Sequence, residues 1–329
     1  MESHIQQDRS SRVTRDDSEA LIAAIARNTL DRRAGIFGPD SMSWKINRES
    51  ALFLGAGRAA LLQLAHPWVA TALEQHSSLM ARPIARFHST FRVLFAMIFG
   101  SLDHALAAAR HLYAVHTRIR GEMPQDIAAY RRGSAYEANE IAALRWVYAT
   151  LIESAVLAYD FVLPPLSLAE HAAYYADSRT LAALFGLPAA SLPEDWTAFL
   201  AYCREMEQSN GLGVSDAARR MAHKLLAGAG SWVKPPQWYR VLTAQWLPER
   251  FRSEFALQYG ADDARALDRA TRWLPGVYRR LPAALRFVGP WHEARARLHS
   301  RGAGPVSRLS NRFWIGQRLL PFAGPKLSS

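Results

Sequence analysis

The chain of 329 residues contains a single cysteine, Cys203. One thiol cannot form an intramolecular disulfide, and it cannot supply a cysteine-ligated zinc or iron–sulfur site. Because Cys203 lies in an apolar helical pattern, we interpret it as an inert structural residue.

Long uninterrupted apolar runs are also absent. The stretch 155–168 is broken by Asp160 and by two prolines, and the apolar stretch 91–100 has only ten residues. A helix that spans a bilayer needs roughly 20 apolar residues, so we predict no transmembrane segment. Residues 1–17 are polar and charged and lack the apolar core of a secretory signal, which predicts a soluble, cytoplasmic protein.

Lysine is scarce as well, so the net charge of +11 comes mainly from arginine. The arginines are spread over most of the chain. The charge therefore permits contact with nucleic acid or anionic lipid but does not indicate it, and we expect no nucleic-acid partner. The alanine- and arginine-rich composition also suits an ordinary enzyme from a GC-rich bacterial genome. Twelve arginines lie in 265–318, and we interpret them as a solvated helix face, with a membrane- or acid-binding patch as the alternative.

Helical periodicity dominates the chain, and the turn signals of β-hairpins are nearly absent. We therefore predict an all-α protein, with one large multi-helix domain over 18–329 after a disordered polar tail at 1–17. Half of the residues are hydrophobic, which is enough for a sizeable core. The expected helices cover 18–30, 48–64, 67–75, 83–99, 102–120, 139–159, 168–185, 193–206, 216–226, 238–244, 248–258 and 261–273.

Two pairs of polar residues interrupt apolar helix faces at a spacing of one turn. His116 and Arg120 follow an apolar stripe on the expected helix 102–120, and Arg86 and Thr90 repeat the spacing on the helix before it. A basic pair on an inward face is costly unless an anion or a metal neutralises it. Two such helices could enclose haem, which needs a nitrogen ligand for iron and cations for its propionates.

Several separated motifs occur in one order along the chain. They are Gly55-Ala-Gly-Arg-Ala-Ala-Leu-Leu-Gln-Leu-Ala-His-Pro67, Gln75-His76-Ser77, Arg86-x-x-x-Thr90, His116-x-x-x-Arg120-Gly121, Trp146-Val-Tyr-Ala-Thr-Leu151, Tyr174-Tyr175 and Leu192-Pro193. Together they resemble the MpaB-type oxygenase and rubber oxygenase (latex clearing protein) family of helical haem proteins. The resemblance covers 48–206, with a weaker echo at Leu281-Pro-x-x-Leu-Arg286.

The resemblance implies a haem b (iron protoporphyrin IX) pocket and a role for each matching residue. His116 matches the family's proximal iron ligand, and Arg120 matches an arginine of the same cofactor shell, which would hold a propionate or tune the proximal side. Arg86 and Thr90 match the distal arginine and threonine that matter for oxygen chemistry. Ser89 stands where a rubber oxygenase can carry an iron-capping lysine, which suggests a distal site open to water or dioxygen.

Two further residues are candidates for contact with the cofactor. Tyr148 stands where most relatives have a histidine, so any chemistry of that histidine is in doubt here. His66 is the alternative to His116 as metal ligand, although it precedes Pro67 and can simply satisfy carbonyls at a helix end. A lone histidine on an apolar face is usually a core or surface residue, and only the resemblance favours His116. A threonine such as Thr90 often bonds back to the preceding turn.

Two patterns have a structural interpretation only. Gly55 and Gly57 are not a dinucleotide fingerprint, because no strand precedes them and the third glycine is missing, so we attribute them to tight helix packing. The pair Glu205 and Glu207 has no metal-ligand spacing and is interpreted as ordinary helix-face carboxylates.

These observations predict a haem b-dependent oxygenase acting on an apolar organic substrate, such as an isoprenoid, a lipid or a natural-product intermediate. The expected co-substrate is dioxygen or peroxide, with an electron donor where the reaction needs one. One alternative is a haem-binding sensor or carrier without turnover, which the Tyr148 difference keeps open. A further alternative is a basic helical module that binds acidic surfaces and no cofactor.

Overall fold

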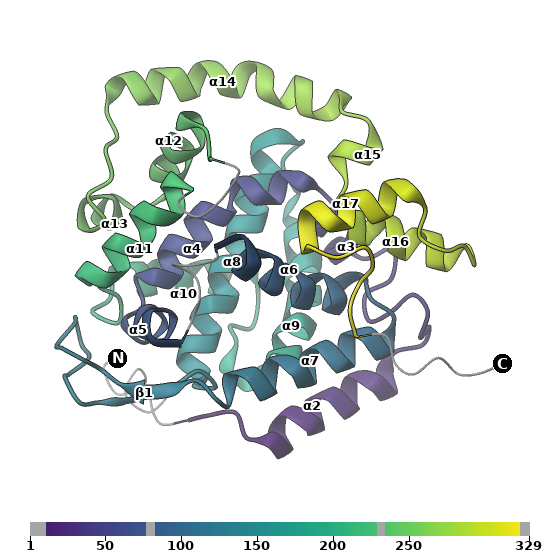
Figure 1. The fold of residues 1–329 in the computed structure, drawn as a ribbon, viewed down its shortest axis with the longest axis horizontal. Coiled ribbons are helices and arrows are strands. Elements are labelled where there is room, and N and C mark those ends of the chain that lie inside the picture. The colour runs from purple at the N-terminus through teal and green to yellow at the C-terminus, as the bar shows by residue number, and fades with distance from the viewer. Residues whose placement is uncertain (1–10, 77–82, 229–233, 323–329) are drawn as a thin grey trace.

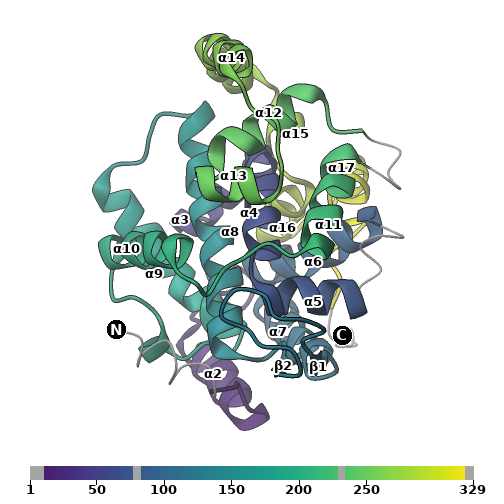
Figure 2. The same ribbon diagram turned by 90° about the vertical axis from the view of Figure 1, so that its left-hand side faces the viewer.

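A computed structural model describes residues 11–76, 83–228 and 234–322. Its helices pack against one another in several directions, and a single short hairpin is the sheet formed by the described residues (Figure 1). Viewed from the side, α14 lies outermost at one end of the molecule and α2 at the other (Figure 2). The predicted all-α fold is confirmed.

The elements follow one another without a long structureless insertion. In chain order they are α2 (Arg15–Asn28), α3 (Met42–Asn47), η1 (Ser50–Leu54), α4 (Ala56–Leu64), α5 (Pro67–His76), α6 (Pro83–Phe99), α7 (Leu102–His116), β1 (Arg120–Glu122), β2 (Ala135–Glu137), α8 (Ile141–Val162), α9 (Leu168–Leu184), η3 (Ala189–Ser191), α10 (Trp196–Gln208), α11 (Asp216–Ala227), α12 (Gln237–Trp246), α13 (Glu249–Glu254), α14 (Ala261–Arg280), α15 (Ala283–Arg286), α16 (Gly289–Leu298) and α17 (Pro305–Ile315).

Helix α8 is the core of the fold. It contacts α4, η1, α14, α9 and α10, and it ends at Leu163, where two prolines stop the helix. Among the described helices, α8 alone is long and apolar enough to cross a membrane, but most of it is buried inside the protein. An all-round apolar sequence is typical of such a buried helix.

Helix α7 ends at His116, four residues earlier than predicted. The Thr117 amide and hydroxyl both donate to the Tyr113 carbonyl oxygen, and the Asn139 side chain donates to the Thr117 hydroxyl at 3.1 Å. The chain then enters β1, in which Arg120 pairs with Glu137 of β2. The prediction that His116 and Arg120 lie one turn apart on a helix is therefore wrong, because a local cap and strand pairing replace the last helical turn.

The N-terminal helix begins earlier than predicted. Thr14 and Asp17 form a capping box, so α2 starts at Arg15, inside the segment predicted to be a disordered tail. Val13 is buried, and its amide donates to the Asn139 carbonyl oxygen. Residues 1–10, where the rest of that prediction falls, lie outside the described residues.

The C-terminal part is more helical than predicted. Helix α14 continues through Pro275 to Arg280, and α15, α16 and α17 follow it. The sequence indicated a solvated helix face for the arginines of 265–318, but no helix bounds beyond residue 273. A proline at or near the start of α15, α16 and α17 divides this part of the chain into short helices. Tertiary packing of α16 and α17 against α6 accounts for their stability.

A buried charge pair anchors this C-terminal part to the start of η1. Glu49 is 1% exposed, and its carboxylate accepts two hydrogen bonds from Arg286, at 2.8 and 2.9 Å. The Tyr278 hydroxyl donates to the same carboxylate at 3.0 Å. The Leu281-Pro-x-x-Leu-Arg286 sequence thus ends on the arginine that neutralises a buried acid, which gives the motif a structural role.

We predict that Glu49→Ala lowers the free energy of unfolding by about 3 kcal/mol, because it leaves the guanidinium of Arg286 without its partner in a low-dielectric region. Chemical denaturation followed by circular dichroism measures the change. The matched control is Glu137→Ala, which removes an exposed partner of Arg12 and should cost less than about 1 kcal/mol. Equal losses in the two variants would contradict a structural role for the Glu49 pair.

Candidate functional site

Arg86 and His116 face each other across the α6–α7 hairpin. Ser101 caps α7 by accepting from the His104 amide, so the chain reverses at 100–101. Arg86 precedes Ser101 by 15 residues and His116 follows it by 15, which places both at the same level of two packed antiparallel helices. Two residues predicted from separate motifs are therefore brought together by the hairpin.

The electrostatics of this pair favour a neutral imidazole. Burial of the ring, and secondarily the positive charge of Arg86, lowers the pKa of His116 to about 4. His116 is therefore uncharged at neutral pH, which is the form that ligates a metal ion. Within the part of the chain that the structure describes, no carboxylate forms an ion pair with Arg86, and burial lowers the pKa of its guanidinium. A half-buried cation beside a neutral imidazole is a favourable place for an anionic, metal-bearing group.

Thr90 lies one turn beyond Arg86 on α6 and is half-buried. Its hydroxyl donates to the Arg86 carbonyl oxygen at 3.1 Å, which is the local back-bond that threonine commonly makes in helices. In this rotamer its oxygen can accept a hydrogen bond but its proton is engaged. The predicted distal role of Thr90 stays a prediction.

His66 lies between α4 and α5, in a small aromatic cluster. Its side chain is 1% exposed, and Nε2 lies 3.3 Å from the Tyr130 hydroxyl, with the Trp68 ring beside both. Helix α4 ends at Leu64 and α5 begins at Pro67, so the predicted helix-end position of His66 is confirmed. Among the described contacts, none joins His66 to Arg86 or His116.

Tyr148 and Arg120 are also apart from the facing pair. The Tyr148 hydroxyl lies 2.7 Å from Ser178 Oγ in the buried layer between α8 and α9, and burial raises the pKa of this phenol. Arg120 is exposed on β1. The structure gives neither residue a described contact with His116, and their predicted contact with a cofactor stays a prediction.

The other family-like motifs hold helices together. The Trp146 indole donates to the Leu62 carbonyl oxygen at 2.8 Å, and the Gln63 amide donates to Thr150 Oγ1 at 3.0 Å, which joins α4 to α8. A Cβ at Gly55 would collide with the Ser154 carbonyl oxygen, so α4 can approach α8 only with glycine there. The packing interpretation of this glycine is confirmed.

Gly121 is also required for close packing. A Cβ on it would lie 2.7 Å from the Tyr136 hydroxyl and 2.9 Å from Gln75 Oε1, and these two atoms are themselves joined by a hydrogen bond of 2.6 Å. The glycine after Arg120 therefore lets β1 pass close to α5. This contact of Tyr136 could not be predicted from the sequence, because Tyr136 lies on a strand and no strand was expected there.

A buried charge cluster around Arg58 was missed. Its guanidinium donates to Glu153 at 2.8 Å, to Glu207 at 3.0 Å and to the Trp246 carbonyl oxygen at 3.0 Å, so one side chain of α4 links α8, α10 and the end of α12. Burial, and then the neighbouring Glu153, raises the pKa of Glu207 to about 7. The interpretation of Glu207 as an ordinary helix-face carboxylate is wrong, because residues distant in sequence bury it.

The described residues contain no group of three or more histidine, cysteine, aspartate or glutamate side chains placed to hold a metal ion. A haem iron needs only one histidine from the protein, so the absence of such a group does not bear on a haem site. Of the two predicted metal ligands, His116 is the one for which a lowered pKa and a cationic neighbour are found.

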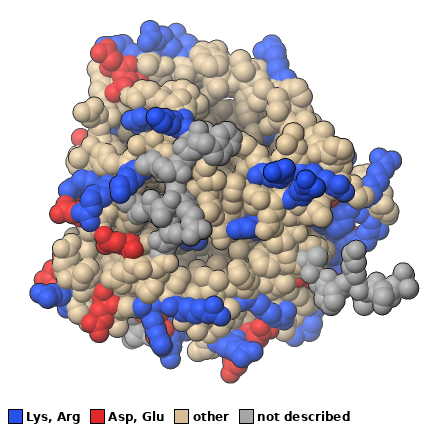
Figure 3. All heavy atoms as spheres, in the orientation of Figure 1, with Lys and Arg blue, Asp and Glu red and all other residues tan. Residues whose placement is uncertain are grey.

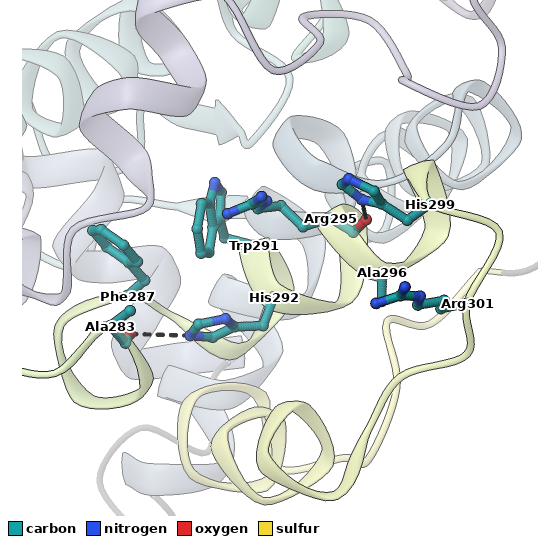
Figure 4. A pocket seen from close by; sticks show the side chains of 8 residues that line it. All are labelled: Ala283, Phe287, Trp291, His292, Arg295, Ala296, His299 and Arg301. Carbon is teal, nitrogen blue, oxygen red and sulfur yellow. Dashed lines mark hydrogen bonds between the residues drawn. The ribbon is translucent and has the colours of Figure 1, made fainter.

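An open pocket of about 410 Å³ lies elsewhere, against α15 and α16 (Figure 4). The Arg295 guanidinium lies 5.1 Å from the Trp291 ring centre, and His292 Nε2 lies 3.1 Å from the Ala283 carbonyl oxygen. Its lining residues are Ala283, Phe287, Trp291, His292, Arg295, Ala296, His299 and Arg301. The pocket includes none of the predicted site residues.

Comparison with protein families gives one match. The model of the catalytic domain of the ER-bound oxygenase mpaB/B′ and rubber oxygenase family matches residues 44–276, which is more than two thirds of the chain. This match contains both helices of the facing pair and extends beyond the 48–206 segment identified from motifs. No curated protein and no solved structure matches the chain significantly.

We predict that Glu207→Gln changes how stability depends on pH. A carboxyl group whose pKa is raised in the folded state stabilises the protein at low pH, and this contribution is lost as the pH rises through about 7. Glutamine cannot lose a proton, so the variant should gain stability relative to the parent protein between pH 5 and pH 8, by an amount on the order of 1 kcal/mol. Urea denaturation at both pH values measures this.

The control is Glu205→Gln, an exposed position on the same helix. It should follow the parent protein at both pH values. If Glu207→Gln also follows the parent protein, the carboxyl group does not titrate in this range.

Proposed function

Because the chain belongs to the mpaB and rubber oxygenase family, we propose that it is a haem b-dependent oxygenase acting on an apolar organic substrate. The family supports oxygenase chemistry. The haem and the substrate class rest on our interpretation of the site. The observation that carries the proposal is the neutral imidazole of His116 with the guanidinium of Arg86 facing it across two packed helices.

The facing residues fit a haem group chemically. His116 would bind the iron, because its unprotonated nitrogen is available at neutral pH. Arg86 would offset negative charge, either on a propionate or on the oxygen co-substrate, and it lacks a carboxylate partner in the described part of the chain. When bound, haem supplies the redox chemistry that activates dioxygen or peroxide, while the protein contributes orientation and electrostatics.

An aromatic cluster beside Arg86 supports an apolar substrate. The rings of Phe87 and Phe91 on α6 lie 4.6 Å apart, and Phe53 of η1 packs on Phe91 at 4.7 Å. Trp314 of α17 stacks on Phe53 at 4.1 Å. Such a wall excludes water and offers dispersion contacts to an isoprenoid or lipid chain but no polar group to orient a hydrophilic substrate.

The remaining predicted residues have weaker support. Arg120 is exposed on β1, so a contact with a propionate would require that it reach back toward α7. His66 and Tyr148 lie in separate buried clusters. We therefore assign the proposed chemistry to His116 and Arg86, with the predicted cytoplasmic location and the electron donor kept as parts of the proposal.

The second candidate function is a haem-binding sensor or carrier. Tyr148 occupies the position at which most relatives have a histidine, and its raised pKa and its hydrogen bond with Ser178 keep it a protonated phenol. A protonated phenol cannot replace a histidine as a base. A reaction that needed this base would therefore fail here, whereas binding of haem would persist.

We predict that protein produced with an adequate supply of haem shows a Soret absorption band that His116→Ala loses. The ligand is removed, while the helix tolerates alanine well. The matched control is His111→Ala, which removes an exposed histidine of the same helix and should keep the band. An equally strong band in His116→Ala would contradict the assignment, and its loss in His66→Ala instead would move the ligand to α4–α5.

We predict that Arg86→Gln keeps the haem band but lowers oxygen consumption with squalene about 100-fold, as expected for loss of one charged donor to a developing oxygen charge. The control is Arg92→Gln on the same helix, with full activity expected. Loss of the haem band in Arg86→Gln would instead give Arg86 a propionate-binding role. Absence of turnover in haem-loaded parent protein would favour the sensor or carrier.

A further inference from the structure

Helix α17 has an apolar stripe that the described residues of the protein leave exposed. Ser307, Asn311 and Ile315 are buried against the body of the molecule. Val306, Leu309 and Phe313 are 56%, 72% and 53% exposed. At 100° per residue these three side chains fall within an arc of about 60°, nearly opposite the buried residues. A surface helix normally presents polar residues there, so this stripe indicates a binding surface.

The stripe is held in place by its contacts with the candidate site. Helix α17 packs on α6 at the front of the molecule (Figure 1). His88 Nε2 lies 2.9 Å from the Phe313 carbonyl oxygen, and Trp314 stacks on Phe53. Gly316 ends the helix with a φ of +70°, and a Cβ there would meet the His88 ring. The exposed stripe therefore has a fixed orientation next to the helix that carries Arg86.

The charge around the stripe has one sign. Residues 301–322 contain four arginines and no aspartate or glutamate. Arg308, Arg312 and Arg318 are exposed, and none of them forms an ion pair within the described ranges. Lys and Arg side chains gather over this part of the face (Figure 3). A partner of this surface must accept aliphatic and aromatic side chains and also carry negative charge.

We propose that α17 docks the protein on an anionic lipid bilayer. Val306, Leu309 and Phe313 enter the boundary between headgroups and acyl chains, and the flanking arginines contact the headgroup phosphates. Nucleic acid would satisfy the arginines but offers no apolar phase to the stripe. A two-fold dimer through α17 would place like charges against one another. The bilayer satisfies both properties of the surface.

Docking in this way would place the aromatic cluster at Phe53 beside the membrane, where an apolar substrate is dissolved. That consequence rests on the proposed function. The docking itself does not, because binding to vesicles is measured without turnover and with or without haem.

The test is flotation of the full chain with vesicles of phosphatidylcholine, with or without phosphatidylglycerol. We expect binding to the vesicles that contain phosphatidylglycerol, weakened by high salt. Leu309→Ser with Phe313→Ser should lower the partition coefficient at least about tenfold, because two apolar contacts with the bilayer are lost. The control is Leu30→Ser, a fully exposed leucine outside α17, with unchanged binding expected.

A second variant, Arg308→Gln with Arg312→Gln, tests the role of charge. Each arginine should contribute about fivefold to binding of anionic vesicles, so the double variant should bind more than about tenfold more weakly. Its control is Arg27→Gln with Arg118→Gln, two exposed arginines of other elements. Because all these positions are exposed, unfolding midpoints should match the parent protein. Unchanged binding of the Leu309 and Phe313 variant would overturn the proposal.

Two other outcomes would also overturn it. Sedimentation velocity without lipid would detect a dimer that the Leu309 and Phe313 variant loses, and this would assign the stripe to a second copy of the chain. Salt-dependent binding of duplex DNA that the arginine variant loses, with no vesicle binding by the parent protein, would assign the surface to nucleic acid.

Discussion

The geometry of the candidate site depends on the tight reversal between α6 and α7. Gly100 permits the turn, since a Cβ there would collide with the Ala96 carbonyl oxygen, and Ser101 starts α7 directly. Helices α6 and α7 pack against each other, so residues equally distant from the turn lie at the same level of the two helices. Arg86 and His116 are such a pair. Chain connectivity thus brings the charge of Arg86 near the imidazole. Burial of the ring, and secondarily this charge, keeps the imidazole neutral.

Buried charges elsewhere make this arrangement rigid. Arg58 joins α4 to α8 and α10, and Arg286 joins α15 to the start of η1, each through carboxylates removed from water. Neither cluster touches the facing pair, yet η1 carries Phe53, which packs on α6. A buried ion pair adds little net stability over an apolar core, but it tolerates few alternative packings. We infer that these clusters specify how the helices around α6 are positioned.

The sequence predicted the fold class and placed Arg86 and His116 on consecutive helices, because both results depend on patterns that can be recognised without tertiary contacts. Periodicity places Arg86 and His116 on two helices, and the motifs identify the family. Arg120 could not be placed in this way, because α7 ends through a hydrogen bond from Asn139, 22 residues away from Thr117. The partners of Arg58 are equally invisible, since three helices supply them. Helix α17 was not delimited, because its buried side is formed by Ser307, Asn311 and Ile315, which do not read as a core-facing apolar stripe in the sequence.

The two sides of α17 connect the candidate site with the exposed stripe. The inner face of α17 contributes Trp314 to the aromatic cluster beside Arg86, while the outer face presents Val306, Leu309 and Phe313 to solvent. A helix that served only to close the core would gain nothing from the outer stripe, which costs free energy in water. A helix that served only to bind a partner would not need to stack on Phe53. An apolar substrate that is dissolved in a membrane requires both, because it must leave one apolar environment and enter another without crossing water.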